Sequence, residues 1–347
     1  MTTLKEIAQA AGVSMTTVSN VINGKFNRVS ADTVERIQAL ISQSGYVPNQ
    51  AARSLAQRES HVVAVIVQAG ENENIFRNPY AAEYVGALTM ELHRSGYYPL
   101  IRFTDDYRDV EADLRGWNVA GAIFSGTFSR HLQYIHSLKT VPTVLTDCYF
   151  RIPGVNHVSV DDDAGGQMAG DYLARMGHRR VAFLANNLQD SEVDQHRLQG
   201  FRAGLAVHGV TLEDRFVLAQ PVAPENAGQL AELLREPGAP TAIFCTADRI
   251  AAQLMQLLSA QGFRVPEDIS VLGFDNLPLA EITQPPLTTL AQDIDQKARL
   301  VVDMLLRHIR QDSLAPERTL LGVWLAERQS VRRIGPPVEA QPPQPAD

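Results

Sequence analysis

The sequence predicts an all-α head followed by a larger α/β domain whose two lobes are built on parallel sheets. In the first 45 residues, apolar side chains recur at helical spacing and glycines interrupt the pattern. From His61 onward, short apolar runs alternate with helical stretches, which is typical of parallel strands covered by helices on both faces. This second region has about 270 residues, which is long for one doubly wound sheet and therefore favours two lobes.

The charge of the chain is unevenly distributed. Lys and Arg total 31 and Asp and Glu total 39, which gives a formal net charge of −8. Residues 1–60 hold six basic and four acidic side chains, a net charge of +2, so the rest of the chain carries −10. A mildly basic head on an acidic body indicates that only the head meets a polyanion.

The composition disfavours several classes of protein. The aliphatic run from Val62 to Val67 is far shorter than the ~20 residues of a membrane-spanning helix, so no membrane partner is expected. The first residues do not combine a basic start with an apolar run, so we expect a cytoplasmic protein. Cys148 and Cys245 have no zinc spacing and form no disulfide framework, and we expect two reduced thiols at strand ends. We expect no metal and no cofactor.

Three short helices are expected in the head, each bounded by residues that favour helix ends. The first ends at Gly12, which permits a tight turn. The second follows Ser14, whose side chain can cap it, and ends at Asn23-Gly24. The third extends from its cap at Ser30 to Gly45. The apolar positions expected inside the bundle are Leu4, Ile7, Ala8, Ala11, Val18, Val21, Ile22, Val34, Ile37, Leu40 and Ile41.

The first two helices have the spacing of a helix-turn-helix. Ala8 is small where the helices touch, and Val13 and Val18 fill the wedge between them. The second helix then presents short side chains that suit the major groove of DNA. These candidate base readers are Met15, Thr16, Thr17 and Asn20. A small helical bundle that binds protein is the alternative.

Phosphate contacts are expected around the same helix. Ser14, Thr17 and Asn23 lie beside exposed backbone N–H groups, which hold anions well. Thr3 and Arg28 complete the set of head residues that we assign to DNA.

Residues 46–60 change character. Pro48 interrupts the chain, and Asn49 can cap a short alanine-rich stretch from Gln50 to Gln57. About eight residues are too few for a stable helix alone in water. The segment is therefore either a plain linker or a helix that forms on a partner.

The head and this segment resemble the DNA-binding head of the lactose repressor family (LacI/GalR type). The matching motifs occur in order and almost without gaps: Leu4-Lys5-Glu6-Ile7-Ala8, Ala11-Gly12-Val13-Ser14, Thr17-Val18-Ser19, Val21-Ile22-Asn23, Val29-Ser30, Gly45-Tyr46-Val47-Pro48-Asn49 and Ala52-Arg53-Ser54-Leu55.

The resemblance implies a hinge helix that becomes ordered only on operator DNA. Leu55 matches the leucine that wedges into the minor groove, where unstacking a base step costs a few kcal/mol. Asn49, Ala52 and Arg53 belong to the same DNA-contacting set. Two hinge segments must act together to repay that cost, so the resemblance also implies a homodimer on near-palindromic double-stranded operator DNA.

Six buried strands are expected in the body. Each is a continuous apolar run rather than an alternating one. The expected strands are Val62–Val67, Ala120–Ser125, Thr143–Asp147, Val181–Ala185, Thr241–Thr246 and Ile269–Asp275. The expected helical stretches are Tyr80–Ser95, Ala164–Met176, Leu198–His208, Ala227–Arg235 and Ala247–Gln261.

Residues 61–330 resemble the effector domain of the same family, which is similar to a periplasmic sugar-binding protein. The motifs that carry this resemblance are Gly177-His178-Arg179-Arg180-Val181-Ala182-Phe183, Arg197-Leu198-Gln199-Gly200-Phe201, Pro240-Thr241-Ala242-Ile243-Phe244, the run from Val265 to Asn276, and Pro286-Leu287-Thr288-Thr289-Leu290. The resemblance implies that the chain crosses between the lobes three times, near Val160–Asp162, Ala291–Gln292 and Leu321–Val323.

An effector site is expected between the lobes, because ligands of parallel sheets bind beyond the carboxyl ends of the strands. Arg197 matches the family's ligand-contacting arginine and Asp275 its ligand-contacting aspartate. A guanidinium and a carboxylate suit a polyhydroxylated ligand, although a structural ion pair is the alternative. Further candidates are Asp147, Ser125, Gln68, Phe76, Asp161, Asp248 and Gln292. Asp248 follows Ala247 where the family often has Asn-Asp, which removes one amide contact.

Other constellations have simpler explanations. Asp161-Asp162-Asp163 resembles a metal cluster but also fits a strand end followed by a helix N-terminus, which we favour. Cys148 and His157 have no accompanying oxyanion motif. Gly165-Gly166 lacks the spacing of a dinucleotide-binding fingerprint.

The expected function is that of a DNA-binding transcriptional regulator, most often a repressor in this family, whose operator affinity is switched by a small-molecule effector between the lobes. A sugar or sugar derivative is the expected effector. The alternatives are a purine- or nucleoside-responsive regulator of the same architecture, a solute-binding protein, or a sugar-modifying enzyme. The last needs an acid–base pair that the sequence does not assemble, so we do not expect an enzyme.

Four segments are therefore expected along the chain. Residues 1–48 form the helix-turn-helix domain and residues 49–60 the hinge helix and linker. Residues 61–334 form the effector-binding and dimerisation domain. Residues 335–347 contain five prolines and no apolar periodicity, and we expect them to be disordered.

Overall fold

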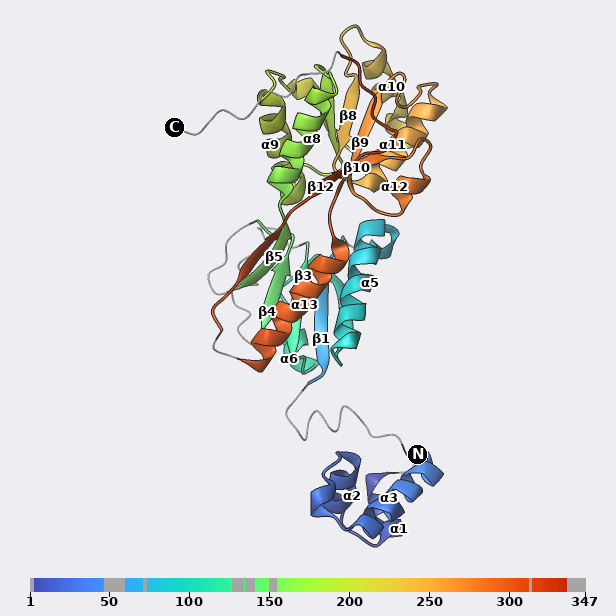
Figure 1. Cartoon of the computed structure of the whole chain (residues 1–347), viewed down its shortest axis with the longest axis vertical. Coiled ribbons are helices and arrows are strands. Elements are labelled where there is room, and N and C mark those ends of the chain that lie inside the picture. Colours follow the sequence, from blue (N-terminus) through green and yellow to red (C-terminus); the bar gives the residue numbers. More distant parts are fainter. Residues whose placement is uncertain are drawn as a thin grey trace. The chain divides into compact units, whose positions relative to one another are not determined.

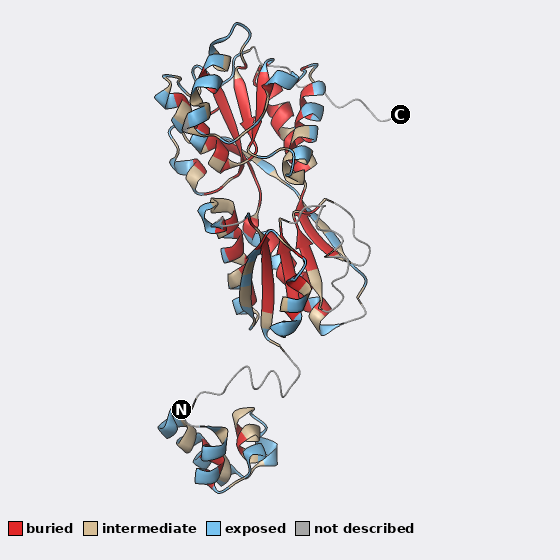
Figure 2. Cartoon of the chain, turned by 180° about the vertical axis from the view of Figure 1, so that it is seen from behind, coloured by how far each residue is buried: buried red, intermediate tan, exposed pale blue. Residues whose placement is uncertain are grey.

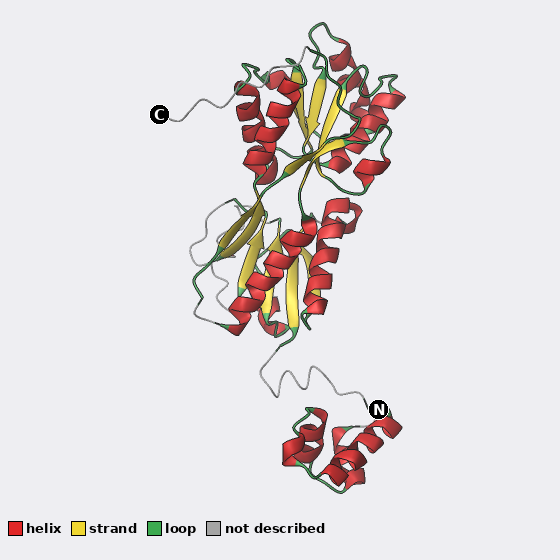
Figure 3. Ribbon diagram, viewed as in Figure 1, coloured by secondary structure: helices red, strands yellow, loops and turns green. Residues whose placement is uncertain are grey.

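The computed structural model describes residues 3–46, 60–70, 74–126, 134, 141–149, 155–311 and 314–335. The chain divides into two compact units, residues 1–61 and residues 62–347 (Figure 1). The first unit is all helical and the second combines helices with two sheets (Figure 3), so the predicted fold class is confirmed. The proline-rich tail beyond Gly335 lies outside the described residues.

The head consists of three helices around a small apolar core. A capping box begins the first helix, because Thr3 N–H donates to the Glu6 carboxylate at 2.9 Å and Glu6 N–H donates to the Thr3 hydroxyl at 3.3 Å. Gly12 has a φ of 65°, which permits the predicted turn. The elements are α1 (Leu4–Ala11), α2 (Met15–Ile22), the 3-10 turn η1 (Phe26–Arg28) and α3 (Ala31–Ser44). The buried residues of the head core are Ile7, Ala8, Ala11, Val18, Val21 and Ile37, all of which were predicted to face inward.

The cap of α3 differs in detail from the prediction. Ser30 occupies the N-cap position, but its hydroxyl donates to the Thr33 hydroxyl at 2.8 Å and makes no bond to the helix backbone. Gly45 ends the helix with a φ of 61°, as expected.

The first lobe of the second unit contains a six-stranded sheet in the order β11-β5-β4-β3-β1-β2. All of its neighbouring strands pair in parallel. The strands are β1 (Val62–Gln68), β2 (Tyr98–Thr104), β3 (Gly121–Ser125), β4 (Thr143–Thr146), β5 (Asn156–Val160) and β11 (Arg318–Leu321). The helical elements of this lobe are η2 (Ile75–Arg77), α5 (Pro79–Arg94), α6 (Val110–Gly116) and α13 (Ile294–Arg310).

The second lobe contains a six-stranded sheet in the order β12-β10-β9-β8-β6-β7. It is parallel except for β12, which pairs antiparallel with β10. The strands are β6 (Val181–Ala185), β7 (Val217–Ala219), β8 (Ala242–Cys245), β9 (Ser270–Asp275), β10 (Thr288–Ala291) and β12 (Trp324–Ala326). The helical elements are α8 (Asp162–Arg175), α9 (Glu192–Ala206), η4 (Asp214–Phe216), η5 (Pro224–Asn226), α10 (Ala227–Arg235), α11 (Asp248–Ala260) and α12 (Leu279–Ile282).

The chain passes between the two lobes three times, at the positions that the resemblance implied. The first passage joins β5 to α8, the second joins β10 to α13, and the third joins β11 to β12. Figure 1 shows the three connections converging between the two sheets. Each lobe is consequently assembled from segments that are far apart in the sequence.

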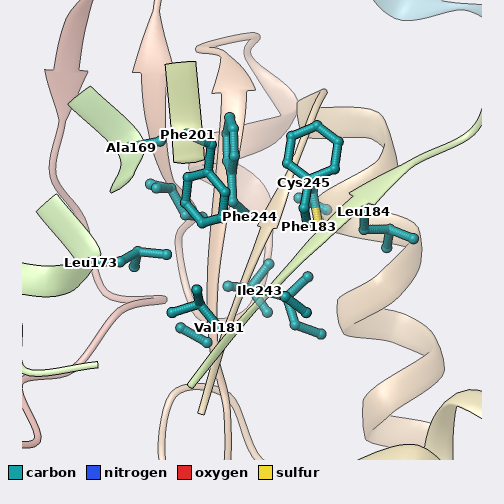
Figure 4. Close-up of a cluster of buried hydrophobic side chains, with 14 of the residues drawn as sticks. Ala169, Leu173, Val181, Phe183, Leu184, Phe201, Ile243, Phe244 and Cys245 are labelled. Carbon is teal, nitrogen blue, oxygen red and sulfur yellow. The ribbon is translucent and has the colours of Figure 1, made fainter. Parts of the chain in front are cut away.

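Each lobe has its own apolar interior. The central strands of both sheets are buried, whereas the edge strands and the outer faces of the helices are partly exposed (Figure 2). In the second lobe, the Phe244 ring lies 5.7 Å from the Phe183 ring and 5.1 Å from the Phe201 ring, measured between centroids (Figure 4). Cys245, at the end of β8, and Cys148, just beyond β4, are both buried. No helix in the described part of the chain is long and apolar enough to span a membrane.

Candidate functional site

The first candidate site is the exposed face of α2 in the head. The Met15 side chain is 53% exposed although it is apolar, and Thr16 is also exposed. Thr17 and Asn20 are half-buried. An exposed apolar side chain among short polar ones is suited to contact thymine methyl groups and base edges in a major groove.

The predicted phosphate-contacting residues lie at the ends of the same helix. Ser14 caps α2, because its hydroxyl accepts from Thr17 N–H at 3.1 Å and lies 2.9 Å from the Thr17 hydroxyl. Asn23 ends the helix and its amide donates to the Ser19 hydroxyl at 3.2 Å. Arg28 is exposed in η1. Thr3 is exposed at the start of α1, where the capping box engages its hydroxyl.

The predicted hinge contacts lie outside the described residues. They are Asn49, Ala52, Arg53 and Leu55.

The second candidate site is a cavity of about 650 Å³ between the two lobes of the second unit. Strand ends and helix starts from both lobes line it, as expected for parallel sheets. Its lining includes six of the predicted effector residues, namely Gln68, Ser125, Asp147, Arg197, Asp275 and Gln292.

Arg197 is the central cation of the second-lobe wall. Its Nε donates to the Asp162 carboxylate at 2.6 Å, and a terminal nitrogen donates to the carbonyl of Thr246. The guanidinium also stacks on the Phe274 ring, 3.4 Å from the centroid. Burial alone would lower the pKa of Arg197, but neighbouring carboxylates, chiefly that of Asp162, raise it. Arg197 is therefore both a member of a buried ion pair and a cavity-lining group.

Asp275 faces the same space from the end of β9. The Gln292 amide donates to its carboxylate at 2.8 Å. Burial raises the pKa of Asp275 well above its ordinary value, and the positive charge of Arg197 opposes that shift. Asp275 has a φ of 118° and Asn276 a φ of 60°, so the backbone turns sharply where the side chain enters the cavity.

Asp147 is the corresponding carboxylate of the first lobe. It follows β4 with a φ of 54°, and the Tyr80 hydroxyl donates to its Oδ2 at 3.5 Å. The Lys297 ammonium donates to its Oδ1. Burial raises the pKa of the Tyr80 hydroxyl well above its usual value, so Tyr80 stays neutral.

Three predicted effector residues do not line the cavity. Phe76 is 45% exposed, and its ring packs edge-on against Phe103 at 5.3 Å between centroids. Asp161 instead caps α8 by accepting from Ala164 N–H at 2.9 Å. This cap agrees with the prediction of a helix N-terminus at the acidic triplet.

Asp248 is fully buried beneath the cavity rather than in it. Its carboxylate accepts from Leu277 N–H at 2.8 Å and from the Thr289 hydroxyl at 2.5 Å. Burial raises the pKa of Asp248 to about 7, and the bond from Thr289 opposes the shift. Its role is to hold the loop after β9 against α11.

Sequence reasoning missed several polar residues of the cavity and its surroundings. Asp194 lies one turn before Arg197 on α9, and that spacing could have suggested it. Asp162 was treated only as part of a helix N-terminus, and Lys297 lies in a helix that was not predicted. The other missed lining residues with polar side chains include Asn78, Tyr80, Asp105, Asn186, Asn187, Ser191, Thr246 and Arg249.

Some lining amides have an oxygen that lacks a hydrogen-bond partner. These buried atoms are Oε1 of Gln68, Oδ1 of Asn186 and Oε1 of Gln292. Such groups are costly unless a ligand or water satisfies them, so the cavity is chemically prepared for a polar ligand. Within the described ranges, no three acidic, histidine or cysteine side chains converge as metal ligands would.

Two family models match the chain. The model described as bacterial regulatory proteins, lacI family, matches residues 3–49, and the model described as a periplasmic binding protein-like domain matches residues 171–331.

Individual proteins are similar over nearly the whole length. The ribose operon repressor of Haemophilus influenzae is 30% identical over 89% of this chain and 92% of its own length. The solved structure of a CelR–cellobiose complex has a TM-score of 0.70 and 29% identity, and covers 95% of this chain and 100% of that chain. The lac repressor dimer bound to operator and the anti-inducer ONPF has a TM-score of 0.84 and 25% identity, and covers 95% of this chain and 99% of that chain.

Proposed function

This chain belongs to the lacI family of bacterial regulatory proteins, and we propose that it represses transcription as a homodimer on near-palindromic operator DNA. It is a DNA-binding transcriptional regulator with an effector-binding α/β domain. The effector that we propose is a neutral sugar bound in the cavity between the lobes. The observation that carries this choice of effector is the polar lining of that cavity. The proposal assigns no catalytic role and locates the protein on the nucleoid in the bacterial cytoplasm.

The head supplies the DNA contacts in this proposal. Residues 1–60 have a net charge of +2 while the whole chain has −8, so phosphates are attracted to the head. Met15, Thr16, Thr17 and Asn20 read base edges, because α2 offers them beside a capped N-terminus. Leu55 supplies the minor-groove wedge that the family resemblance implies.

The exposed edge of the first-lobe sheet supports the homodimer. β2 is one of the two edge strands of this sheet, and its Ile101 and Phe103 side chains are 38% and 40% exposed. Phe76 packs on Phe103 and extends this apolar strip. Edge strands with exposed apolar side chains pair readily with another chain, and the similar lac repressor structure is a dimer.

The charges of the lining favour a neutral ligand over a phosphorylated one. Carboxyl groups outnumber guanidinium groups among the described lining residues, since Asp105, Asp147, Asp194 and Asp275 face only Arg197 and Arg249. A phosphate would add charge beside Asp275, whose ionisation is already opposed by burial. Sugar hydroxyls can instead donate to the carboxylates and accept from Arg197.

A purine is the second candidate, and the lining disfavours it. Tyr80 is the one aromatic side chain among the described lining residues, and its hydroxyl is engaged with Asp147 and Lys297. Purine sites commonly stack the base on an aromatic face, whereas hydroxyl-rich ligands need many acceptors.

The effector is tested by thermal shift and calorimetric titration. D-ribose, D-xylose, D-glucose and cellobiose are compared with ribose 5-phosphate, adenine and guanine. At least one neutral sugar should raise the melting temperature, because a ligand that binds only the folded state stabilises it. A shift produced only by the phosphate or by a purine would contradict the proposed effector.

The DNA-binding role is tested with a palindromic duplex selected from random sequence. Binding should weaken steeply as salt rises, because phosphate contacts release counterions. Leu55→Ala should weaken specific binding and leave the affinity for the effector unchanged. A gel shift in which Leu55→Ala binds the operator as well as the wild type would remove the wedge from the proposal.

A further inference from the structure

Lys297 is a buried lysine that lies directly behind the wall of the cavity. Its side chain is 0% exposed, and it belongs to the first turn of α13. The neighbouring positions Ile294, Ala298 and Val301 on α13 are also buried and apolar. A lysine therefore occupies the inner face of this helix among apolar side chains.

Two physical costs oppose a lysine at this position. Removing an ammonium group from water is costly unless a partner compensates it. The first turn of a helix also carries the positive end of the helix dipole, which disfavours a cation. A charge kept against both costs needs strong local partners.

The partners of Lys297 are two residues that line the cavity. Its Nζ donates to Asp147 Oδ1 and, at 2.8 Å, to the Tyr80 hydroxyl. The Tyr80 hydroxyl in turn donates to Asp147 Oδ2 at 3.5 Å, which closes a ring of three hydrogen bonds. The ammonium also lies 4.8 Å from the centroid of the Tyr84 ring, which favours a cation at its face.

The three hydrogen bonds among Lys297, Tyr80 and Asp147 fix both oxygens of the Asp147 carboxylate. Asp147 needs such restraint because it lies just after the carboxyl end of β4, where its backbone has a left-handed φ of 54°. Its side chain is 12% exposed, so part of the carboxylate still faces the cavity. Lys297 itself is not among the lining residues, so any effect on a ligand must pass through Asp147 and Tyr80.

We propose that Lys297 is a positioning residue for effector binding. From behind the cavity wall, its ammonium holds the Asp147 carboxylate and the Tyr80 hydroxyl in the orientation that receives hydroxyl groups of a neutral ligand. Because the Lys297 ammonium is paired with Asp147, it is not available to bind a phosphate group in the cavity. The inference rests on the proposed function, since it assumes that the cavity holds the effector.

The test is a double-mutant cycle on sugar affinity. The full-length wild type, Lys297→Met, Asp147→Asn and the double variant are titrated with whichever of the four neutral sugars shifts the wild-type melting temperature most. Lys297→Met should lose at least tenfold in affinity. In the Asp147→Asn background the same substitution should change affinity less than twofold, because no carboxylate remains to be positioned.

Arg299→Met is the matched control, because it removes a positive charge from an exposed position of the same helix. It should bind the sugar like the wild type. If Lys297→Met does not fold, Lys297→Gln takes its place with the same expected direction, and melting curves without sugar establish which variants are folded.

The outcomes separate the inference from the function beneath it. A folded Lys297 variant with wild-type affinity, or equal losses with and without the Asp147 carboxylate, would overturn the positioning role while the wild type still binds sugar. A wild type that binds none of the four sugars would overturn the proposed effector class, and the positioning role with it.

Discussion

Each lobe sets a pair of helices beside the cavity, and the two pairs pack by different means. In the second lobe, α8 and α9 cross with their backbones in direct contact. Gly166 and Gly170 on α8 face Gly200 and Gly204 on α9, and a Cβ at any of these positions would overlap backbone atoms of the other helix. In the first lobe, α5 and α13 pack through large apolar side chains from one buried cluster.

The difference decides how each lobe holds its cation. Gly166 lies against the backbone carbonyl of Arg197, so the guanidinium is positioned by helices that tolerate no side chain between them. Lys297 is positioned by packed side chains and by its bonds to Tyr80 and Asp147. Substitutions that add side-chain atoms between α8 and α9 should therefore destabilise the second lobe. The first lobe should instead be sensitive to substitutions that shrink its packed side chains or remove their charges.

Of the substitutions that test this difference between the lobes, Arg197→Ala should have the largest effect. It leaves the Asp162 carboxylate, whose side chain is 1% exposed, without its partner, and breaking such a pair costs about 3–5 kcal/mol. We expect a large fall in melting temperature and no response to effector, with operator binding retained at low temperature. Arg202→Ala on the same helix, which removes an exposed pair with Asp214, is the control. Equal melting temperatures for the two variants would contradict the claim that Arg197 stabilises the fold through its buried pair with Asp162.

Gly200→Ala should have the next largest effect. Its Cβ would overlap the backbone carbonyl of Asp163, and overpacking of this kind costs up to about 3 kcal/mol. Arg197 lies one turn before Gly200, so sugar affinity should fall as well. Urea unfolding and sugar titration measure the two effects. Unchanged values for both would mean that the two helices can separate freely.

Acid is expected to weaken both lobes alike, because each contains a buried histidine whose pKa is lowered by burial. Burial lowers the pKa of His157 in the first lobe and of His178 in the second to about 4. In the unfolded chain each histidine has a pKa of about 6.5, so it takes up a proton as the pH falls from 6.5 towards 4. In the folded chain the same histidine stays neutral over this pH range. Each histidine should therefore cost about 1 kcal/mol at pH 5.5 and nothing above pH 7.5.

Melting temperatures at pH 7.5 and pH 5.5 measure this loss. His157→Gln and His178→Gln should each reduce the difference between the two pH values, whereas His93→Gln, at an exposed position, should leave it unchanged. An effect confined to one histidine would show that the lobes differ here as well.

The smallest effect is expected from Gly86→Ala in α5, and it has the opposite sign. Gly86 lies mid-helix and a Cβ there would meet nothing within 4 Å. Replacing such a glycine with alanine stabilises a helix by about 0.5–1 kcal/mol. Urea unfolding should show this gain. A loss instead would indicate that another chain lies against this face of α5.

The sequence predicted the elements whose interiors are purely apolar. The six expected strands all exist, and Val181–Ala185 agrees at both ends. β5 was missed because it buries Asn156, His157 and Ser159. β10 was missed because its buried threonines read as polar. The side chains of Asn156, Thr288 and Thr289 bond to distant segments, as Asn156 does to the Thr143 carbonyl at 3.2 Å, and no local pattern reveals such bonds.

The cavity was predictable in outline and less so in detail. Family motifs identified Arg197 and Asp275, and strand ends identified Ser125 and Asp147. The expected start of α9 at Leu198 was six residues late, because its first turns are polar where they line the cavity. Local rules fail where polar groups are buried for a function, and the missed residues gather at such places.

The threefold passage of the chain has a consequence for biosynthesis. When a ribosome has made residues 1–287, the first lobe still lacks α13 and β11, and the second still lacks β10 and β12. Neither lobe can close over its apolar interior until segments within the final 60 residues have emerged. A truncated product would expose apolar surface on both lobes. It would therefore be a target for chaperones and proteases and not a functional fragment.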